Sequence, residues 1–448
     1  MKLDDRYTAE QGSVYLTGIQ ALVRLPMDQM RRDRRWGLNT AAFISGYEGS
    51  PLGGYDLALA RVRPLLDQHH IHFVPGLNED LAATSIFGSQ LVHVLGESKY
   101  DGVVGIWYGK GPGVDRSGDI FRHANLSGTG CNCAALVLGG DDHISKSSSI
   151  PHQSDLSFYN FGTPVFYPGN TQEILDYGLL AIALSRFSGA WVALKMVTNV
   201  CDGGSTVDLD PERPEIAIPP GYEKRSDARL IIPYTLALEN EVTYRRLDAA
   251  LDFARVNGVN QMLGARQGAR LGIATAGKPY YDLMQALRDL NIRSDELAGL
   301  GVRIAKFGMT FPLEPFFAAE FAAGLEKILV IEEKRSFLEL QLREALYNTA
   351  PRPILVGKKD EDGRLLVPAT AELDAEQISK VLARYLPHRE SIAVRLDRLA
   401  EIAARDREKI DARAPNFCSG CPHNRSTLLL EGQVAGGGIG CQIGRAHV

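Results

Sequence analysis

The sequence lacks the features of membrane-bound, secreted and nucleic-acid-binding proteins. Its apolar runs are broken by glycine or charge and are too short to span a bilayer. Acidic residues stand near the N-terminus, where a signal peptide has an apolar core. The net charge of -5 and the absence of a long polybasic run argue against nucleic acid as a partner. We therefore expect a cytoplasmic protein whose partners include neither a membrane nor a nucleic acid.

Several chemical motifs are also missing. The chain has no internal repeat, no low-complexity tract, no P-loop, no nucleophile elbow and no Ser-His-Asp arrangement. The composition is ordinary, with 45% hydrophobic and 23% charged residues. A chain of 448 residues with this composition is expected to fold into two or three domains with large cores.

Cysteine is scarce, with only six in the chain, and three of them, Cys418, Cys421 and Cys441, lie near the C-terminal end. Cys418 and Cys421 form a C-x-x-C turn, which can present two thiolates to one metal ion or cluster. We interpret the three thiols as ligands of an iron-sulfur or zinc site. A buried thiol pair or a redox-active dithiol is the alternative that the spacing leaves open.

Four continuous apolar runs in the N-terminal half are separated by helical stretches. They span residues 40–47, 102–108, 134–140 and 190–196. Such runs predict an α/β fold in which helices cover both faces of a parallel sheet. Ligands of such folds bind at the carboxyl ends of the strands, so we expect functional residues there.

The C-terminal half predicts a second α/β unit. A proline-rich stretch over residues 208–221 reads as a linker, and a charged helical segment follows it over residues 240–260. Residues 270–277 and 327–331 predict strands, and residues 389–413 predict a charged helix.

Polar and glycine-rich segments follow the predicted strands of the first unit. Tyr47, Ser50 and Pro51 belong to one such turn, and the segment from Gly109 to Asp119 follows the next strand. Asp141, at the end of a third run, is followed by further small and polar residues. Each segment could be only a turn, but their coincidence at one sheet edge indicates a ligand site.

Glu79 stands at the start of an apolar helix. A carboxylate in this position can simply cap the helix. The functional alternative is a carboxylate that shares a proton with a bound heterocycle, with its pKa raised by burial. The residues alone leave both interpretations open.

Together these motifs resemble indolepyruvate ferredoxin oxidoreductase in its long fused-chain form, a branch of the thiamine-dependent 2-oxoacid:ferredoxin oxidoreductases. The resemblance rests on Gly109 to Asn125, Glu48 to Pro51, Asn78-Glu79 and Cys418 to His423, and it extends over residues 8–441. It implies a thiamine diphosphate-binding α/β fold followed by a transketolase-C-like α/β domain.

The resemblance also implies a division of the chain. It comprises an aminopyrimidine-binding domain (residues 8–205), a linker and helical segment (206–264), a transketolase-C-like domain (265–385), a helical linker (386–413) and the start of a diphosphate-binding domain (414–441). The Gly-Asp-Gly stretch that holds magnesium and diphosphate in the family does not follow Cys441. Residues 442–448 are expected to be an artefact, because residues 443–448 can be encoded by ATCGGAAGAGCACACGTC, which resembles the read-through of a common sequencing adapter.

The roles of single residues follow from the same resemblance. Glu79 would hydrogen-bond N1′ of the pyrimidine of thiamine diphosphate and so promote loss of the proton from C2 of the thiazolium. The residues that would line the cofactor or substrate pocket are Tyr47, Ser50, Pro51, Gly111, Pro112 and Gly113. Cys418, Cys421 and Cys441 would hold an iron-sulfur cluster, of the [4Fe-4S] type.

The resemblance implies oxidative decarboxylation of indolepyruvate and other arylpyruvates to aryl-acetyl-CoA. Coenzyme A is then the co-substrate, ferredoxin accepts the electrons, magnesium accompanies the cofactor, and the complete enzyme is a homodimer. The 448-residue fragment is expected to be inactive alone. The alternatives are pyruvate or a branched-chain 2-oxoacid as substrate, or a non-catalytic homologue that keeps the fold.

Overall fold

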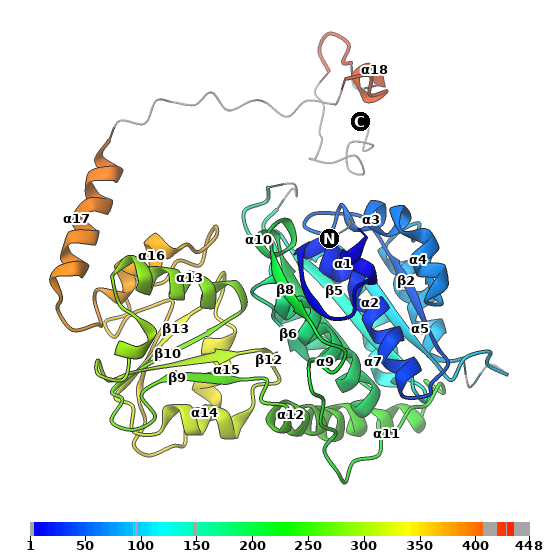
Figure 1. Cartoon of the computed structure of the whole chain (residues 1–448), viewed down its shortest axis with the longest axis horizontal. Coiled ribbons are helices and arrows are strands. Elements are labelled where there is room, and N and C mark those ends of the chain that lie inside the picture. Colours follow the sequence, from blue (N-terminus) through cyan, green and yellow to red (C-terminus); the bar gives the residue numbers. More distant parts are fainter. Residues whose placement is uncertain are drawn as a thin grey trace.

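The computed structural model describes residues 4–92, 94, 97–146, 150–405, 419–426 and 428–433. Two α/β units lie side by side, each built on its own sheet (Figure 1). The predicted fold class is confirmed, since parallel strands with helices between them form the core of both units.

The first sheet has seven strands in the order β12-β6-β7-β5-β4-β2-β3. Their bounds are β2 (Thr40–Gly46), β3 (Ile71–Phe73), β4 (Gly102–Lys110), β5 (Ala134–Asp141), β6 (Val165–Phe166), β7 (Trp191–Val197) and β12 (Met309–Phe311). All neighbouring pairs are parallel except β6 and β12, which are antiparallel. The four apolar runs of the N-terminal half are therefore the central strands β2, β4, β5 and β7, as predicted.

Helices cover both faces of this sheet. The helices α2 (Gly18–Arg35) and α9 (Thr171–Ser188) pack on one face, and α5 (Glu79–Gln90) and α7 (Gly118–Ser127) pack on the other. Alternate strand residues supply the two cores, so that Ile106 faces one core and its neighbour Trp107 the other. This burial on both faces is the reason that the strands are apolar throughout.

The second sheet has five strands in the order β14-β13-β10-β11-β9. They are β9 (Gln261–Gly264), β10 (Leu271–Ala276), β11 (Val302–Phe307), β13 (Lys327–Ile331) and β14 (Ile354–Val356), with β9 antiparallel to β11. The helices of this unit are α13 (Gly277–Asp289), α14 (Pro315–Ala322), α15 (Leu338–Leu346) and α16 (Ala375–Leu382), with the short 3-10 helix η2 (Ser294–Glu296).

The segment between the units contains regular structure. Strand β8 (Gly204–Leu209) crosses the expected boundary at residue 205 and pairs antiparallel with β1 (Gly12–Thr17). The helical part is α11 (Tyr234–Asn240), the π-helix η1 (Glu241–Arg246) and α12 (Leu247–Val256). The remaining helices are α1 (Asp5–Thr8), α3 (Tyr55–Arg61), α4 (Arg63–Gln68), α6 (Gly111–Arg116), α8 (Asp155–Phe161), α10 (Thr198–Asp202), α17 (Glu390–Ala404) and α18 (His423–Ser426). The assignment of domains to these parts stays a prediction.

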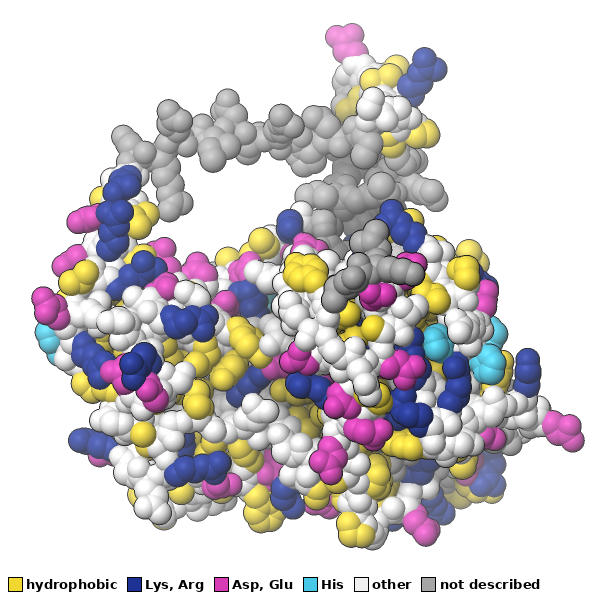
Figure 2. All heavy atoms as spheres, viewed as in Figure 1, with side chains coloured by type: hydrophobic (Ala, Val, Ile, Leu, Met, Phe, Trp, Pro, Cys, Tyr) yellow, Lys and Arg dark blue, Asp and Glu magenta, His cyan; other side chains and the backbone are white. Residues whose placement is uncertain are grey.

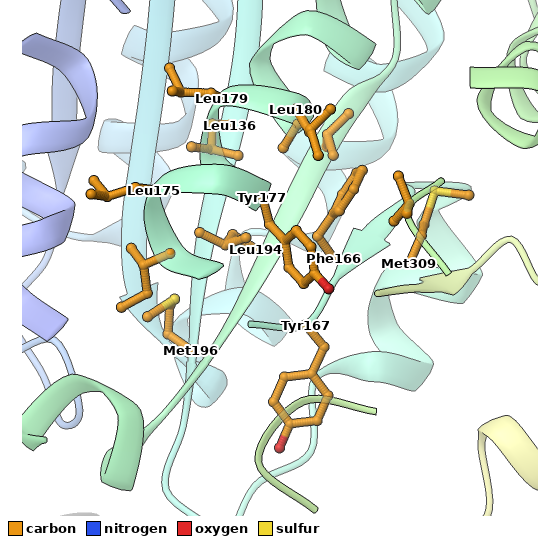
Figure 3. Close-up of a cluster of buried hydrophobic side chains, with 14 of the residues drawn as sticks. Leu136, Phe166, Tyr167, Leu175, Tyr177, Leu179, Leu180, Leu194, Met196 and Met309 are labelled. Atoms are coloured by element: carbon orange, nitrogen blue, oxygen red, sulfur yellow. The ribbon is translucent and has the colours of Figure 1, made fainter. Parts of the chain in front are cut away.

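The two units share a core and a charged contact. Strand β12 comes from the C-terminal half but joins the first sheet, and its Met309 lies in the same buried cluster as Phe166 and Tyr177 (Figure 3). Beside this cluster, the ammonium group of Lys306 on β11 pairs with Glu173 on α9. Buried apolar and charged contacts therefore hold the second unit against the first.

The described part of the chain contains no helix that is both long enough and apolar enough to cross a lipid bilayer. On the face shown in Figure 2, basic and acidic side chains are interspersed over both units.

Candidate functional site at the carboxyl edge of the first sheet

The turns that follow β2, β4 and β5 meet at one edge of the first sheet. The backbone N–H of Tyr47 donates to the carbonyl of Tyr108 at 3.0 Å. A Cβ placed on Gly49 would lie 2.8 Å from Cδ of Lys110, and one placed on Gly140 would lie 2.8 Å from Cδ of Pro51. Hence glycine allows close approach of the turns, and the segments of Tyr47 and Pro51 lie beside the ends of β4 and β5, as expected.

Glu79 is the first residue of α5. Asn78 caps this helix, because its side chain accepts a hydrogen bond from the N–H of Leu81 at 2.9 Å. The indole N–H of Trp107 donates to the Glu79 carbonyl at 3.1 Å, which fixes the backbone at this point. Since Asn78 supplies the cap, the Glu79 carboxylate is left available for another partner.

The Glu79 side chain is 11% exposed and packs against Gly113 of α6. A Cβ on Gly113 would lie 2.7 Å from Cγ of Glu79 and 3.0 Å from its Oε1. The guanidinium of Arg116 lies 3.8 Å from Oε2 of Glu79 and donates to Asp80 at 2.9 Å. A buried carboxylate, a bare glycine surface and a cation thus stand together at the carboxyl edge.

The glycine-rich segment after β4 is helical, which its sequence pattern did not predict. Residues 111–116 form α6 and residues 118–127 form α7, so Gly111, Pro112 and Gly113 occupy a first helical turn. Proline suits this position, because it has no N–H to leave unpaired there. Gly111 packs against the ring of His152, where a Cβ would lie 1.9 Å from Nδ1.

Sequence reasoning missed a buried charged cluster behind this helix. The Nζ of Lys195 on β7 donates to Asp155 at 2.6 Å and lies 3.7 Å from Asp141 at the end of β5. Burial disfavours the charge of Lys195, but the two carboxylates outweigh it and raise the pKa of the ammonium. The signal was present in the sequence, since Lys195 is a charge inside an otherwise apolar strand.

The cluster continues into the second unit through Glu333, which follows β13. Its carboxylate accepts a hydrogen bond from the Tyr167 hydroxyl at 3.1 Å and lies 2.8 Å from Nδ1 of His143 and 3.5 Å from Nζ of Lys278. Burial opposes the charge of Glu333, but His143, Lys278 and Lys195 lower its pKa to about 2. The candidate site therefore touches the second unit through buried charge.

The predicted metal ligands fall largely outside the described residues. Cys418 and Cys441 lie outside them, and Cys421 is a half-buried free thiol. Among the described residues, histidine, cysteine and carboxylate side chains form no group of three or more that could hold a metal ion. The three-thiol site stays a prediction.

Comparison with known proteins supports the resemblance that the motifs indicated. A family model described as the indolepyruvate oxidoreductase domain matches residues 260–407. The indolepyruvate oxidoreductase subunit IorA of Methanothermobacter marburgensis is 25% identical over 429 residues, which cover 94% of this chain and 61% of that protein. The IorA subunit of Pyrococcus abyssi is 24% identical over 323 residues, covering 71% of this chain and 47% of that protein.

A solved structure shares the fold. The 2-oxoglutarate:ferredoxin oxidoreductase from Magnetococcus marinus, determined with 2-oxoglutarate, coenzyme A and succinyl-CoA bound, superposes with a TM-score of 0.60 at 15% identity. The match covers 85% of this chain and 66% of that one. The chain spans about three fifths of the length of the Methanothermobacter relative. These findings confirm the family resemblance and the fold.

Proposed function

We propose that this relative of the indolepyruvate oxidoreductases forms the aminopyrimidine side of a thiamine diphosphate site in a 2-oxoacid:ferredoxin oxidoreductase. The observation that carries the proposal is the buried carboxylate of Glu79 against the bare surface of Gly113. We further propose indolepyruvate and related arylpyruvates as substrates, since the relatives named above are indolepyruvate oxidoreductase subunits.

The residues present fit the pyrimidine half of thiamine diphosphate. Gly113 carries no Cβ, so the Glu79 side chain lies directly against the backbone of α6, and 11% of that side chain stays exposed to meet a ring. Tyr47, Ser50 and Pro51 stand in the neighbouring turn after β2, where they would flank the ring. The bound cofactor would supply an electron sink for decarboxylation of the 2-oxoacid.

The protein's own part is to hold a proton at Glu79. With the helix cap supplied by Asn78, the carboxylate can take a hydrogen bond from a heterocyclic N–H or return a proton to it. The Arg116 guanidinium lies 3.8 Å from Oε2 of this carboxylate. Only 11% of the Glu79 side chain is exposed, so little of it is open to water.

The face around Glu79 also exposes apolar side chains. Leu77 is 85% exposed and Leu81 is 49% exposed, one on either side of the carboxylate in the sequence. Exposed apolar side chains beside a site are available for contact with another domain or subunit. This observation supports our proposal that the diphosphate-binding domain of a homodimer closes over the site.

The rest of the reaction belongs, in our proposal, to a longer protein. The chain spans 61% of the Methanothermobacter relative, and we propose that the remaining part carries the magnesium and diphosphate site. Cys418, Cys421 and Cys441 would hold a [4Fe-4S] cluster that passes electrons to ferredoxin, while coenzyme A captures the acyl group. We expect the 448-residue chain alone to be inactive. The cytoplasmic location stays a prediction.

Replacing Glu79 with glutamine in the complete enzyme tests the proposal. The amide keeps the shape but cannot exchange a proton, so ferredoxin reduction by indolepyruvate and coenzyme A should fall by at least about 100-fold. Glu97→Gln is the matched control, since Glu97 is exposed in a loop. Unchanged turnover of Glu79→Gln would exclude the proton role. Rates with pyruvate and a branched-chain 2-oxoacid would decide the substrate class.

A further inference from the structure

His152 stands between two carboxylates from different parts of the first unit. Its Nε2 lies 2.8 Å from Oδ2 of Asp115 on α6, and its Nδ1 lies 3.3 Å from Oδ1 of Asp141 at the end of β5. Only 10% of the His152 side chain is exposed. The imidazole is thus a buried bridge between a helix and the sheet.

The sheet end of this bridge is rigid. Asp141 is fully buried and accepts hydrogen bonds from the hydroxyl of Ser154 at 2.7 Å and from its N–H at 3.0 and 3.1 Å. The Nζ of Lys195 on β7 lies 3.7 Å away. Burial raises the pKa of Asp141, but the bond from His152 and the nearby cations outweigh it, and the pKa lies well below its usual range.

The helix end of the bridge is more open, since the Asp115 side chain is 55% exposed. Asp115 also accepts a hydrogen bond from the Ser157 hydroxyl on α8 at 2.7 Å. The ring itself contacts the backbone of Gly111, since a Cβ there would lie 1.9 Å from Nδ1. His152 therefore touches the first turn of α6, in which Gly113 faces Glu79.

The second unit supports the segment that carries His152. The side-chain amide of Gln153 donates to the carbonyl of Arg335 at 3.1 Å and accepts from the Arg335 N–H at 3.1 Å. The Lys334 ammonium donates to the carbonyl of His143, at the other end of the same connection between β5 and α8. The position of His152 thus depends on both units.

The charge state of the bridge follows from its neighbours. Burial lowers the pKa of His152, but the carboxylates of Asp141 and Asp115 outweigh burial and raise it above the usual value. As an imidazolium the ring donates from both nitrogens, whereas the neutral ring leaves one carboxylate without its donor. Lys195 and His143 are the other titratable groups that act on Asp141.

We propose that His152 is a positioning residue that clamps α6 to the end of β5 and thereby sets the Gly113 surface against which Glu79 is oriented. This inference rests on the proposed function of Glu79. Among the described residues, His152 contacts α6 and not the Glu79 carboxylate, so its removal should lower kcat while leaving the KM for the 2-oxoacid unchanged.

The test uses the complete enzyme with His152→Phe, His152→Gln and Asp115→Asn. Phenylalanine keeps a ring but removes both hydrogen bonds, and kcat should fall by about 100-fold, the scale of a small misplacement of reacting groups. Glutamine keeps one donor towards Asp115, so the kcat of His152→Gln should be about 10-fold higher than that of His152→Phe. The control is His388→Phe, because His388 is exposed and far along the chain, after α16.

The pH profile separates positioning from simple structural support. The wild-type enzyme should lose activity at alkaline pH, because the imidazolium of His152 deprotonates there. Asp115→Asn removes one carboxylate, lowers the pKa of His152, and should move this alkaline limb to lower pH, while His152→Gln should lack it. Titration of the His152 ring by proton NMR in the 448-residue chain measures the same change in pKa without turnover.

The outcomes are distinguishable. If the wild type does not reduce ferredoxin with any 2-oxoacid, the proposed function fails. If the wild type is active but all three variants keep its kcat and its pH profile, the positioning role fails. A lowered unfolding temperature with an unchanged kcat and pH profile would also overturn it, since that result describes a structural contact only.

Discussion

The Glu79 carboxylate and Gly113 lie so close that no side chain fits between them. A Cβ on Gly113 would stand 2.7 Å from Cγ of Glu79, although the two residues belong to different helices. Helix α5 brings the acid and α6 brings the bare backbone, and both begin at the carboxyl edge of the sheet. The relationship explains why a glycine is needed in the first turn of α6.

Gly113→Ala should therefore impair activity more than stability. The added methyl group would meet Cγ of Glu79, so the side chain must shift, and the free energy of unfolding should fall by about 1 kcal/mol. The complete enzyme should lose about 10- to 100-fold in kcat, because the displaced group is the proposed proton carrier. Urea unfolding and ferredoxin reduction measure the two effects.

Gly88→Ala is the matched control, because Gly88 lies in the same helix as Glu79 with no atom within 4 Å of a Cβ there. It should stabilise the protein by up to about 1 kcal/mol and leave kcat unchanged. Equal activity of Gly113→Ala and Gly88→Ala would contradict the close packing of Glu79 on α6.

Glu333 should make stability depend on pH in the acid range. Its pKa is about 2 in the folded protein and 4.5 for a free side chain, so the ionised group stabilises the fold above pH 4.5. This contribution is lost as the pH falls from 4.5 towards 2 and amounts to about 3 kcal/mol.

Glu333→Gln tests this dependence by urea unfolding at several pH values. The difference from the wild type should be largest above pH 4.5 and shrink below it. Glu326→Gln is the control, since that side chain is 63% exposed in its pair with Arg270 and should change little. If the difference in the free energy of unfolding does not vary with pH, the contacts of Glu333 do not keep its carboxylate ionised.

The C-x-x-C prediction can be tested by metal analysis. If Cys421 is a cluster ligand, Cys421→Ser in the complete enzyme should lower the iron content and weaken the electron paramagnetic resonance signal of a reduced [4Fe-4S] cluster. Cys201→Ser is the control, because Cys201 is a fully buried thiol in the first core. Zinc in place of iron in the wild type would identify a structural site.

The central strands could be predicted from the sequence because both faces of the first sheet are buried. Strand β11 was missed because it contains Arg303 and Lys306, whose partners come from elsewhere. Arg303 donates to the carbonyls of Ala265 and Phe321, and Lys306 pairs with Glu173 of the first unit. A strand that buries charge in tertiary contacts has no apolar signature for a sequence pattern to show.

The candidate site could also be predicted from the sequence only in part. The turns after β2, β4 and β5 could be placed because each follows a predicted apolar run, whereas the role of Glu79 came from the family resemblance. His152 could not be placed, because Asp115 and Asp141 stand 37 and 11 residues away from it. Which carboxylates meet a histidine is decided by packing, which a single sequence does not encode locally.

Asp33 joins α2 to α9 and should be a large contributor to the stability of the first unit. Its carboxylate is fully buried and takes two bonds from Arg186, both at 2.6 Å, with further bonds from Thr40 at 2.5 Å and Gln29 at 2.8 Å. Asp33→Ala leaves the Arg186 charge without its partner, and the free energy of unfolding should fall by about 3 to 5 kcal/mol.

The matched comparison is Asp67→Ala, which breaks the pair with Arg63 on α4. The side chains of Arg63 and Asp67 are 55% and 59% exposed, so the free energy of unfolding should change by no more than about 1 kcal/mol. Asp33→Asn should lie between the two, because the amide oxygen can still accept one bond from Arg186. Equal unfolding midpoints for Asp33→Ala and Asp67→Ala would show that burial adds nothing to the pair, contrary to the geometry of α2 and α9.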